Sequence, residues 1–246
     1  MFCARNNVSC AECGKDSPDW ISLNLGCLIC IECSGVHRSL GVHISKVRSL
    51  SLDDLDPEEY ALVYKIGNKV SNSIWEEFIP TDYPRPKAKD SYSARDKFIR
   101  LKYLEKEFIS RIDPKILDNL NFKLQMACFK DDLFEAAKAL AYGASPNTIA
   151  ESDFMLFIQS EGDVNVKNSF SGTESALHIA VKRGALSCCV LLILNGSDAK
   201  IQDKDNKTPV DLALELGHTS IYSYFTRKAD LIKFVNIDNR SSPTIS

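Results

Sequence analysis

The sequence predicts a mostly α-helical protein in which a small α/β domain packs on a stack of α-helical repeats. Three observations predict this fold class: two cysteine pairs near the N-terminus, helical spacing of apolar residues in the middle of the chain, and a 33-residue repeat in the C-terminal half. The 246 residues, of which 44% are apolar and 26% charged, suit a globular protein of one or two domains.

Composition excludes several classes of protein. The net charge of -3 gives no support for a nucleic-acid-binding protein. The longest apolar stretch, Cys188 to Leu194, has seven residues, far fewer than the roughly 20 that a transmembrane helix needs. The N-terminus lacks the apolar core of a signal peptide. We therefore expect a cytoplasmic protein without a transmembrane segment, and nine scattered cysteines agree with a reducing compartment.

Two of the cysteine pairs have the spacing of a metal site: Cys10-x2-Cys13, sixteen residues, then Cys30-x2-Cys33. Each pair can occupy two corners of a tetrahedron, and the loop between them closes it, which predicts one structural Zn²⁺. Cys27 adds a third thiol at the same step, so spacing alone leaves Cys27 and Cys30 open as the second pair. DNA-reading zinc fingers follow the metal site with basic residues, but residues 34–51 contain only three. DNA binding is therefore not expected.

The middle of the chain contains one predicted strand, at 47–52, and three predicted helices. The first begins at Asp56 with a proline at its first position and stops at Gly67-Asn68. The second covers 70–78, and the third runs from a capping box at 93–96 to about residue 109.

Residues 85–115 carry ten basic and five acidic side chains. This excess predicts either a face that meets anionic lipid or an acidic protein, or an ordinary solvated helix surface.

The C-terminal half contains an internal repeat. Residues 175–180 align with 208–213 at an offset of 33, and the period and composition are those of ankyrin repeats. A weaker copy at 122–147 is followed by an insert at about 148–171. Three copies are about the minimum for a stable stack. We therefore divide the chain into a zinc domain at 1–118, repeats at 119–237 and a disordered tail at 238–246.

The N-terminal motifs resemble those of a known family. The segments 20–26 and 30–53, the dipeptide at 67–68 and the signature C-x2-C-x16-C-x2-C-x4-R are similar to those of Arf GTPase-activating (Arf GAP) domains. With the ankyrin repeats, the chain most resembles the Arf GAPs that also carry coiled-coil and PH domains. The chain has no room for those two modules, so we expect a fragment, or a short form that depends on partners of its repeats for location.

The resemblance implies roles for particular residues. It makes Cys10, Cys13, Cys30 and Cys33 the zinc ligands, with Cys27 a packed neighbour, and it places Arg38 at the position of the family's arginine finger. Such an arginine neutralises the charge that develops when a partner GTPase hydrolyses GTP. It also implies that Trp20, Ile31, Leu52 and Asp53 contact the GTPase.

Other readings of these residues remain open. Trp20 can instead cover the zinc site from within the core, and Leu52 can pack under the strand. His37 and His43 flank Arg38, but four thiolates already saturate the metal, so we interpret both histidines as structural hydrogen-bonding groups.

The sequence thus favours a GTPase activator that completes the active site of an Arf-family partner in membrane traffic and is not itself a hydrolase. The alternative is a catalytically inactive scaffold that binds Arf or other proteins. The ankyrin surface is a candidate site for a further protein partner. We expect a cytoplasmic location with peripheral association at endosomal or other vesicle membranes.

Overall fold

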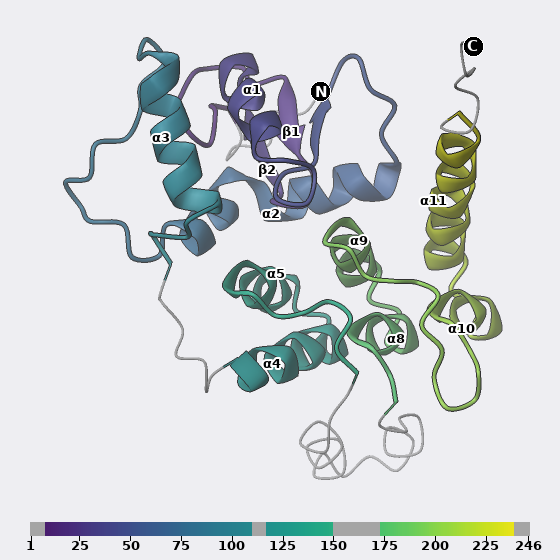
Figure 1. Ribbon diagram of the computed structural model, residues 1–246. Coiled ribbons are helices and arrows are strands. Elements are labelled where there is room, and N and C mark those ends of the chain that lie inside the picture. The colour runs from purple at the N-terminus through teal and green to yellow at the C-terminus, as the bar shows by residue number, and fades with distance from the viewer. Residues whose placement is uncertain (1–7, 110–116, 150–172, 239–246) are drawn as a thin grey trace, which may run out of the picture.

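The computed structural model describes residues 8–109, 117–149 and 173–238 (Figure 1). The predicted insert at 148–171 lies outside the described residues except for its first two positions, and so does the predicted tail except for Asp238. The described chain is mainly helical with one small sheet, so the predicted fold class is confirmed. The boundary near residue 118 stays a prediction.

In the N-terminal half, residues 8–109 form the sheet and three helices. The strands are β1 Trp20–Ser22, β2 Cys27–Ile29 and β3 Val47–Ser49, all antiparallel in the order β2-β1-β3. The helices are α1 Ile31–Ser39, α2 Pro57–Trp75 and α3 Tyr92–Tyr103. In Figure 1, α1 lies above the strands and α2 below them, next to the repeat helices.

Each face of the sheet borders a different apolar core. Side chains alternate along a strand, so neighbours point to opposite faces. Trp20 of β1 and Ile29 of β2 are register partners and belong to the core that contains the paired cysteines. Ile21 and Leu28, the next register pair, belong to the core that continues into the repeats. The sheet therefore connects the cysteine cluster to the repeat stack.

Helix α2 joins the first two predicted helices, and it begins as predicted. Asp56 is its N-cap and Pro57 its first residue. The predicted stop at Gly67 is a kink: Gly67 has φ 65° and ψ 173°, after which helical backbone resumes and ends at Trp75. Glycine adopts this left-handed φ without a steric cost. The sequence pattern thus identified both the break and a helix after it, which ends at Trp75 rather than at residue 78.

Helix α3 and strand β3 differ from the predicted elements at their ends. The N-cap of α3 is Ser91, whose Oγ accepts a hydrogen bond from the amide of Ala94, so the capping box predicted at 93–96 is wrong. The helix ends at Tyr103, and Lys106 then reverses the chain with φ 55°. The strand ends at Ser49 because the chain turns there.

The described residues of the C-terminal half form three antiparallel helix pairs, drawn from teal to yellow in Figure 1. They are α4 Leu117–Lys130 with α5 Leu133–Tyr142, α8 Ala176–Lys182 with α9 Leu186–Leu194, and α10 Pro209–Glu215 with α11 Thr219–Asp238. Ser175 and Thr208, 33 residues apart, both cap their helices through capping boxes. The sequence repeat is therefore also a structural repeat.

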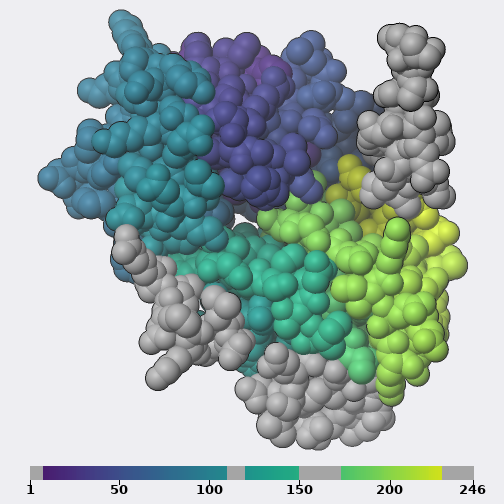
Figure 2. All heavy atoms as spheres, in the orientation of Figure 1, coloured from purple at the N-terminus to yellow at the C-terminus, as the bar shows by residue number. Residues whose placement is uncertain are grey.

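The two halves pack closely against each other (Figure 2). Leu62, Val63 and Ile66 of α2 share one core with the repeat helices. Ion pairs add to this contact: Arg227 of α11 lies 2.7 Å from Asp56, and Lys138 of α5 lies 2.8 Å from Glu77. A cleft of about 210 Å³ remains between the halves.

Candidate functional site

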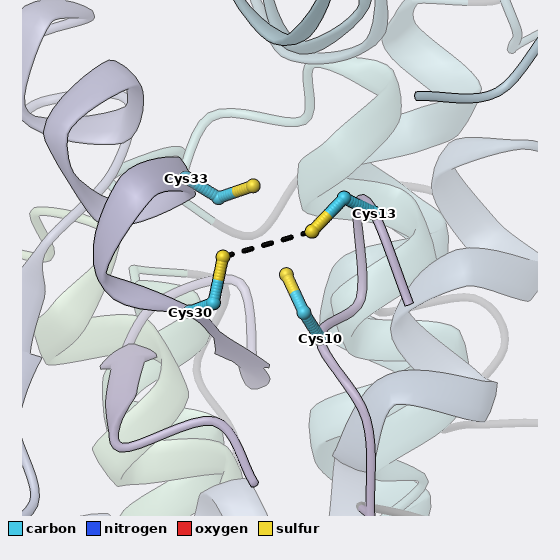
Figure 3. A group of neighbouring side chains, drawn as sticks. All are labelled: Cys10, Cys13, Cys30 and Cys33. Carbon is cyan, nitrogen blue, oxygen red and sulfur yellow. Dashed lines mark hydrogen bonds between the residues drawn. The ribbon is translucent and has the colours of Figure 1, made fainter. Parts of the chain in front are cut away.

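Four cysteine sulfurs form a compact buried cluster (Figure 3). The Sγ atoms of Cys10, Cys13, Cys30 and Cys33 all lie within 4.8 Å of one another, and those of Cys13 and Cys30 are 3.6 Å apart. A tetrahedral Zn²⁺ with Zn–S bonds of about 2.3 Å requires sulfur atoms about 3.8 Å apart. Cys27 is buried but outside this group. The donor set fits zinc, and the structure assembles the set that uses Cys30 and Cys33.

Local backbone structure accounts for the position of each pair. Cys10 and Cys13 lie in a turn closed by the amide of Gly14, which donates to the carbonyl of Cys10 at 3.1 Å. Cys30 is the N-cap of α1, and Cys33 lies in its first turn. A helix N-terminus favours negative charge, so it stabilises thiolates there. Hydrogen bonds from Cys30 and Cys33 lower the pKa of Cys10 to about 4. The hydrogen bonds to Cys10 raise the pKa values of Cys30 and Cys33, so the cluster without a metal favours a thiolate at Cys10.

Two amide side chains of α2 hold the first cysteine pair in place. Asn68 donates to the carbonyls of Ser9, at 2.6 Å, and Leu28, and its Oδ1 accepts from the amide of Leu28 at 2.6 Å. Asn72 donates to the carbonyl of Ala11 at 3.0 Å. The sequence marked Asn68 as part of a helix stop and of the segments that carry the family resemblance, and it did not identify Asn72.

A buried charge network lies behind the cysteine cluster. Glu12, between the first two cysteines, has one carboxylate oxygen 3.1 Å from Nζ of Lys102 and accepts a hydrogen bond from Tyr103 at 2.8 Å. Burial alone would raise the pKa of Glu12, but the charge of Lys102 and the bonds to His37 and Tyr103 lower it to about 2. Lys102 also lies 2.8 Å from Glu76. The network therefore joins the turn of the first pair to α1, α2 and α3.

The network corrects the interpretation of the basic region. Arg95 and Lys102 are both buried, so neither belongs to a lipid-facing or a solvated helix face. Arg95 donates to the carbonyl of Ala88 at 2.6 Å. Burial favours a lower pKa for Arg95, but its hydrogen bond to Cys13 and the nearby thiols raise it. A buried cation beside the thiols offsets part of the charge of a thiolate cluster.

Arg38 lies near the end of α1 and is exposed. Its guanidinium carbon is 4.4 Å from the centroid of the Trp20 ring. Within the described parts of the chain, no carboxylate forms an ion pair with it. The preceding residue, His37, is fully buried, with Nδ1 2.9 Å from Oγ of Ser45 and Nε2 3.4 Å from Glu12. The inward contacts of His37 fix the helix, and Arg38 points outward as a result.

The other candidate contact residues fall into two groups. Ile31 and Leu52 are 57% and 80% exposed, so the reading of Leu52 as a residue packed under the strand is wrong. Trp20 is only 8% exposed and packs in the core of the cysteine cluster, which favours its core reading. Asp53 is exposed, and its Oδ2 accepts from the amide of Ser49 at 2.6 Å, closing the turn after β3.

The strand register relates this turn to Arg38. Trp20, which stacks against Arg38, is the register partner of Ser49 in the pairing of β1 with β3. Of the two histidines, His37 makes the structural hydrogen bonds predicted for it. For His43, which is exposed, no hydrogen bond is formed with the described residues. The structural role predicted for His43 therefore lacks support.

Comparison with known proteins agrees with this site. Residues 1–112 match the family model described as "Putative GTPase activating protein for Arf", and residues 158–213 match the model for ankyrin repeats. The chain is 30% identical over 88% of its length to the mouse "Arf-GAP with coiled-coil, ANK repeat and PH domain-containing protein 2" and 31% identical over 90% to the Arabidopsis thaliana "ADP-ribosylation factor GTPase-activating protein AGD2". It covers 36% and 34% of these two proteins, about a third of their length.

The fold and the buried cysteine cluster define a small domain with a donor set that fits zinc, attached to helical repeats. The N-terminal domain is an Arf GAP domain, and the chain joins it to ankyrin repeats.

Proposed function

We propose that this chain accelerates GTP hydrolysis by a small GTPase of the Arf family, with Arg38 acting on the partner's bound nucleotide. The observation that carries the proposal is the placement of Arg38, which is exposed and free of any carboxylate among the described residues, on a helix whose first turn is formed by two of the clustered cysteines. Small GTPases hydrolyse GTP slowly, and an arginine supplied in trans raises the rate by about 10³–10⁵.

The surroundings of Arg38 support this role. A finger must be held in position and must also remain charged. The ring of Trp20 supports the guanidinium by a cation–π contact, and arginine stays protonated at any physiological pH. The planar guanidinium can donate two parallel hydrogen bonds to phosphate oxygens, which a lysine ammonium cannot do.

The cysteine cluster has a structural role in this proposal. Cys10, Cys13, Cys30 and Cys33 would hold Zn²⁺, which supplies rigidity and no reactive coordination position, because four thiolates saturate it. The turn at 10–13 and the first turn of α1 are thereby fixed to each other. The direction of Arg38 then follows from helix geometry.

The partner is expected to meet the exposed apolar side chains on this side of the domain. Ile31 lies on α1 with Arg38, and Leu52 lies in the turn that Asp53 closes. Leu52→Asp should weaken binding of a GTP-loaded Arf protein without lowering the melting temperature. Leu214→Asp is the matched control, since Leu214 is 63% exposed on α10. Equal loss of binding in both variants would contradict this contact.

The decisive experiment is a single-turnover hydrolysis assay on a panel of Arf-family GTPases with wild type and Arg38→Lys. We expect acceleration by wild type, and loss of nearly all of it in Arg38→Lys with binding retained. Arg183→Lys is a matched control, because the guanidinium carbon of Arg183 lies 4.6 Å from the centroid of Phe129 in the repeats. Full acceleration by Arg38→Lys would overturn the finger assignment. Binding by wild type without acceleration would establish the scaffold alternative.

The proposal includes a location. None of the helices in the described ranges is long and apolar enough to cross a membrane. We propose that the chain reaches Arf proteins at endosomal or other vesicle membranes by peripheral association, with the ankyrin surface available to a protein partner. Imaging of a fluorescently labelled full chain, with and without a co-expressed Arf protein, tests this part independently of catalysis.

A further inference from the structure

Gly35 is unlike the other glycines that the structure describes. Each of the others has a positive φ, which favours glycine for backbone reasons. Gly35 lies in the middle of α1 with helical backbone. A Cβ atom built at Gly35 meets nothing within 4 Å, whereas one at Gly26 would come within 2.6 Å of Ile66. Neither backbone conformation nor internal packing accounts for the missing side chain at position 35.

A glycine inside a helix weakens that helix relative to alanine, because it has more conformational freedom to lose on folding. At position 35, alanine fits the described structure without displacing any atom. The fold would thus be as stable or more stable with alanine. The advantage of glycine at this position must therefore come from something that approaches α1 from outside.

The neighbours of Gly35 on α1 indicate which kind of surface would contact the helix. Successive residues of an α-helix are turned by about 100°, so Ile31, Gly35 and Arg38 project within an arc of about 60°. All three positions are exposed. Gly35 is one turn before the arginine, between it and an apolar side chain that is 57% exposed. An exposed cation next to an apolar residue is complementary to a protein surface that carries an anionic group.

We propose that the GTP-bound Arf-family GTPase comes into van der Waals contact with the backbone of α1 at Gly35, and that the missing side chain sets how deeply Arg38 reaches. This inference rests on the proposed function and identifies a specific part of its docking surface. A side chain reaches a nucleotide inside another protein only if the two surfaces approach closely around it. Even one methyl group at Gly35 would hold the surfaces apart, and a displacement of about 1 Å can reduce a rate by about 100-fold.

The test uses the zinc-loaded full chain and the variants Gly35→Ala and Gly35→Leu. Gly35→Ala should have an unchanged or higher melting temperature and an unchanged zinc content. It should lower kcat/KM for hydrolysis at least tenfold and weaken binding of the GTPase loaded with a non-hydrolysable GTP analogue. Gly35→Leu should abolish both the acceleration of hydrolysis and the binding of the GTPase. Ser73→Leu places the same leucine side chain at an exposed position of α2, the helix below the sheet, and should leave both readouts unchanged.

The outcomes separate this inference from the proposed function. If wild type accelerates hydrolysis and Gly35→Ala does so equally well, the contact at Gly35 is wrong and the proposed function stands. If Gly35→Ala unfolds at a lower temperature, the glycine serves the fold and the inference is overturned. If wild type binds the GTPase without accelerating hydrolysis, the catalytic role of Arg38 is wrong. The affinity of Gly35→Ala for the GTPase then still tests the contact at Gly35. If wild type neither binds any GTPase of the panel nor accelerates its hydrolysis of GTP, the proposed function and the contact at Gly35 are both wrong.

Discussion

The guanidinium carbon of Arg38 lies 4.4 Å from the centroid of the Trp20 ring, and the strand register places Trp20 opposite Ser49, where the turn bearing Leu52 begins. One aromatic side chain thus supports the proposed finger from below and joins α1 to the turn after β3. Its position depends on the core around the cysteine cluster, to which the ring belongs. The cysteine cluster and the proposed catalytic surface are therefore coupled through Trp20.

Replacing Trp20 should reduce catalysis in proportion to the loss of the aromatic ring. A cation–π contact contributes about 0.5–1 kcal/mol at an exposed site, so Trp20→Leu should lower the single-turnover rate by about twofold to fivefold at saturating chain. Trp20→Phe keeps a smaller aromatic ring, and its rate should lie between those of wild type and Trp20→Leu. Phe129→Leu, beneath Arg183, should leave the rate unchanged. A wild-type rate in Trp20→Leu would show that the ring does not support the finger.

Zinc removal should loosen the N-terminal half first. The four ligands belong to the core that also contains α1 and α3 residues, while α9 belongs to the core of the repeats. After treatment with a chelator, hydrogen exchange should show early loss of amide protection in α1 and retained protection in Val190–Leu192 of α9. A structural zinc site contributes folding free energy directly, which is the reason for this order. Simultaneous loss of protection in α1 and α9 would contradict it.

Lys102 should be the most sensitive lysine of α3. It is fully buried and lies 3.1 Å from Glu12 and 2.8 Å from Glu76. Lys102→Met leaves Glu12 without its cation and Glu76 with only Arg85, and it should lower the free energy of unfolding by about 3–5 kcal/mol. Lys97→Met, on the exposed side of the same helix, should change it by less than about 0.5 kcal/mol.

Chemical denaturation of the zinc-loaded protein measures both variants. Adding Glu12→Gln to Lys102→Met removes one unpaired charge and should recover part of the loss. Equal stability of the Lys97 and Lys102 variants would show that the buried network does not contribute.

The repeats should lose stability on mild acidification because of His178. Its Nε2 lies 3.1 Å from the carbonyl of Lys207 and donates to it, and its Nδ1 accepts from the hydroxyl of Ser175 at 2.8 Å. Burial lowers the pKa of His178 below 6.5, although the bond to Lys207 opposes this shift. The unfolded chain therefore binds a proton at a higher pH than the folded chain. Stability is complete above pH 6.5 and declines as the pH falls from there through the folded pKa.

Urea unfolding of wild type between pH 7.5 and 5.5 should show this decline, by up to about 1.4 kcal/mol per unit of pKa depression. His178→Gln has no proton to bind at this position and should show a flatter dependence. His43→Gln is the control, since His43 is exposed and should keep the wild-type slope. A stability that rises below pH 6.5 would contradict the burial of a neutral imidazole.

Local patterns predicted those features that depend on local chemistry. The cysteine spacing and the proline start of α2 each have a physical cause within a few residues. The repeat alignment of 175–180 with 208–213 also has a local cause, because Ser175 and Thr208 cap equivalent helices, but these caps were not predicted. The end of α3 was missed because it depends on the chain reversal at Lys106. The cysteine spacing also did not decide between Cys27 with Cys30 and Cys30 with Cys33 as the second pair. That choice needed the family resemblance or the folded geometry.

The buried charges could not be recognised from the sequence. Lys102 and Arg95 lie among other basic residues in a segment that is polar in composition, and nothing local distinguishes them from Lys97. Their burial depends on contacts with Glu12, 90 residues away from Lys102, and with the cysteine cluster. Gly35 was likewise only part of a motif until the open space around it was known.

The core that α2 shares with the repeats has a consequence for how such chains can be recombined. Leu62 and Ile66 pack in one apolar cluster with Leu191 and Leu177. The repeats therefore cannot be exchanged independently of the N-terminal domain. A chimera that took its repeats from a relative would also need the matching residues of α2. Substitutions in α2 and in the repeat helices that it contacts should consequently be correlated among relatives, even though these segments are far apart along the chain.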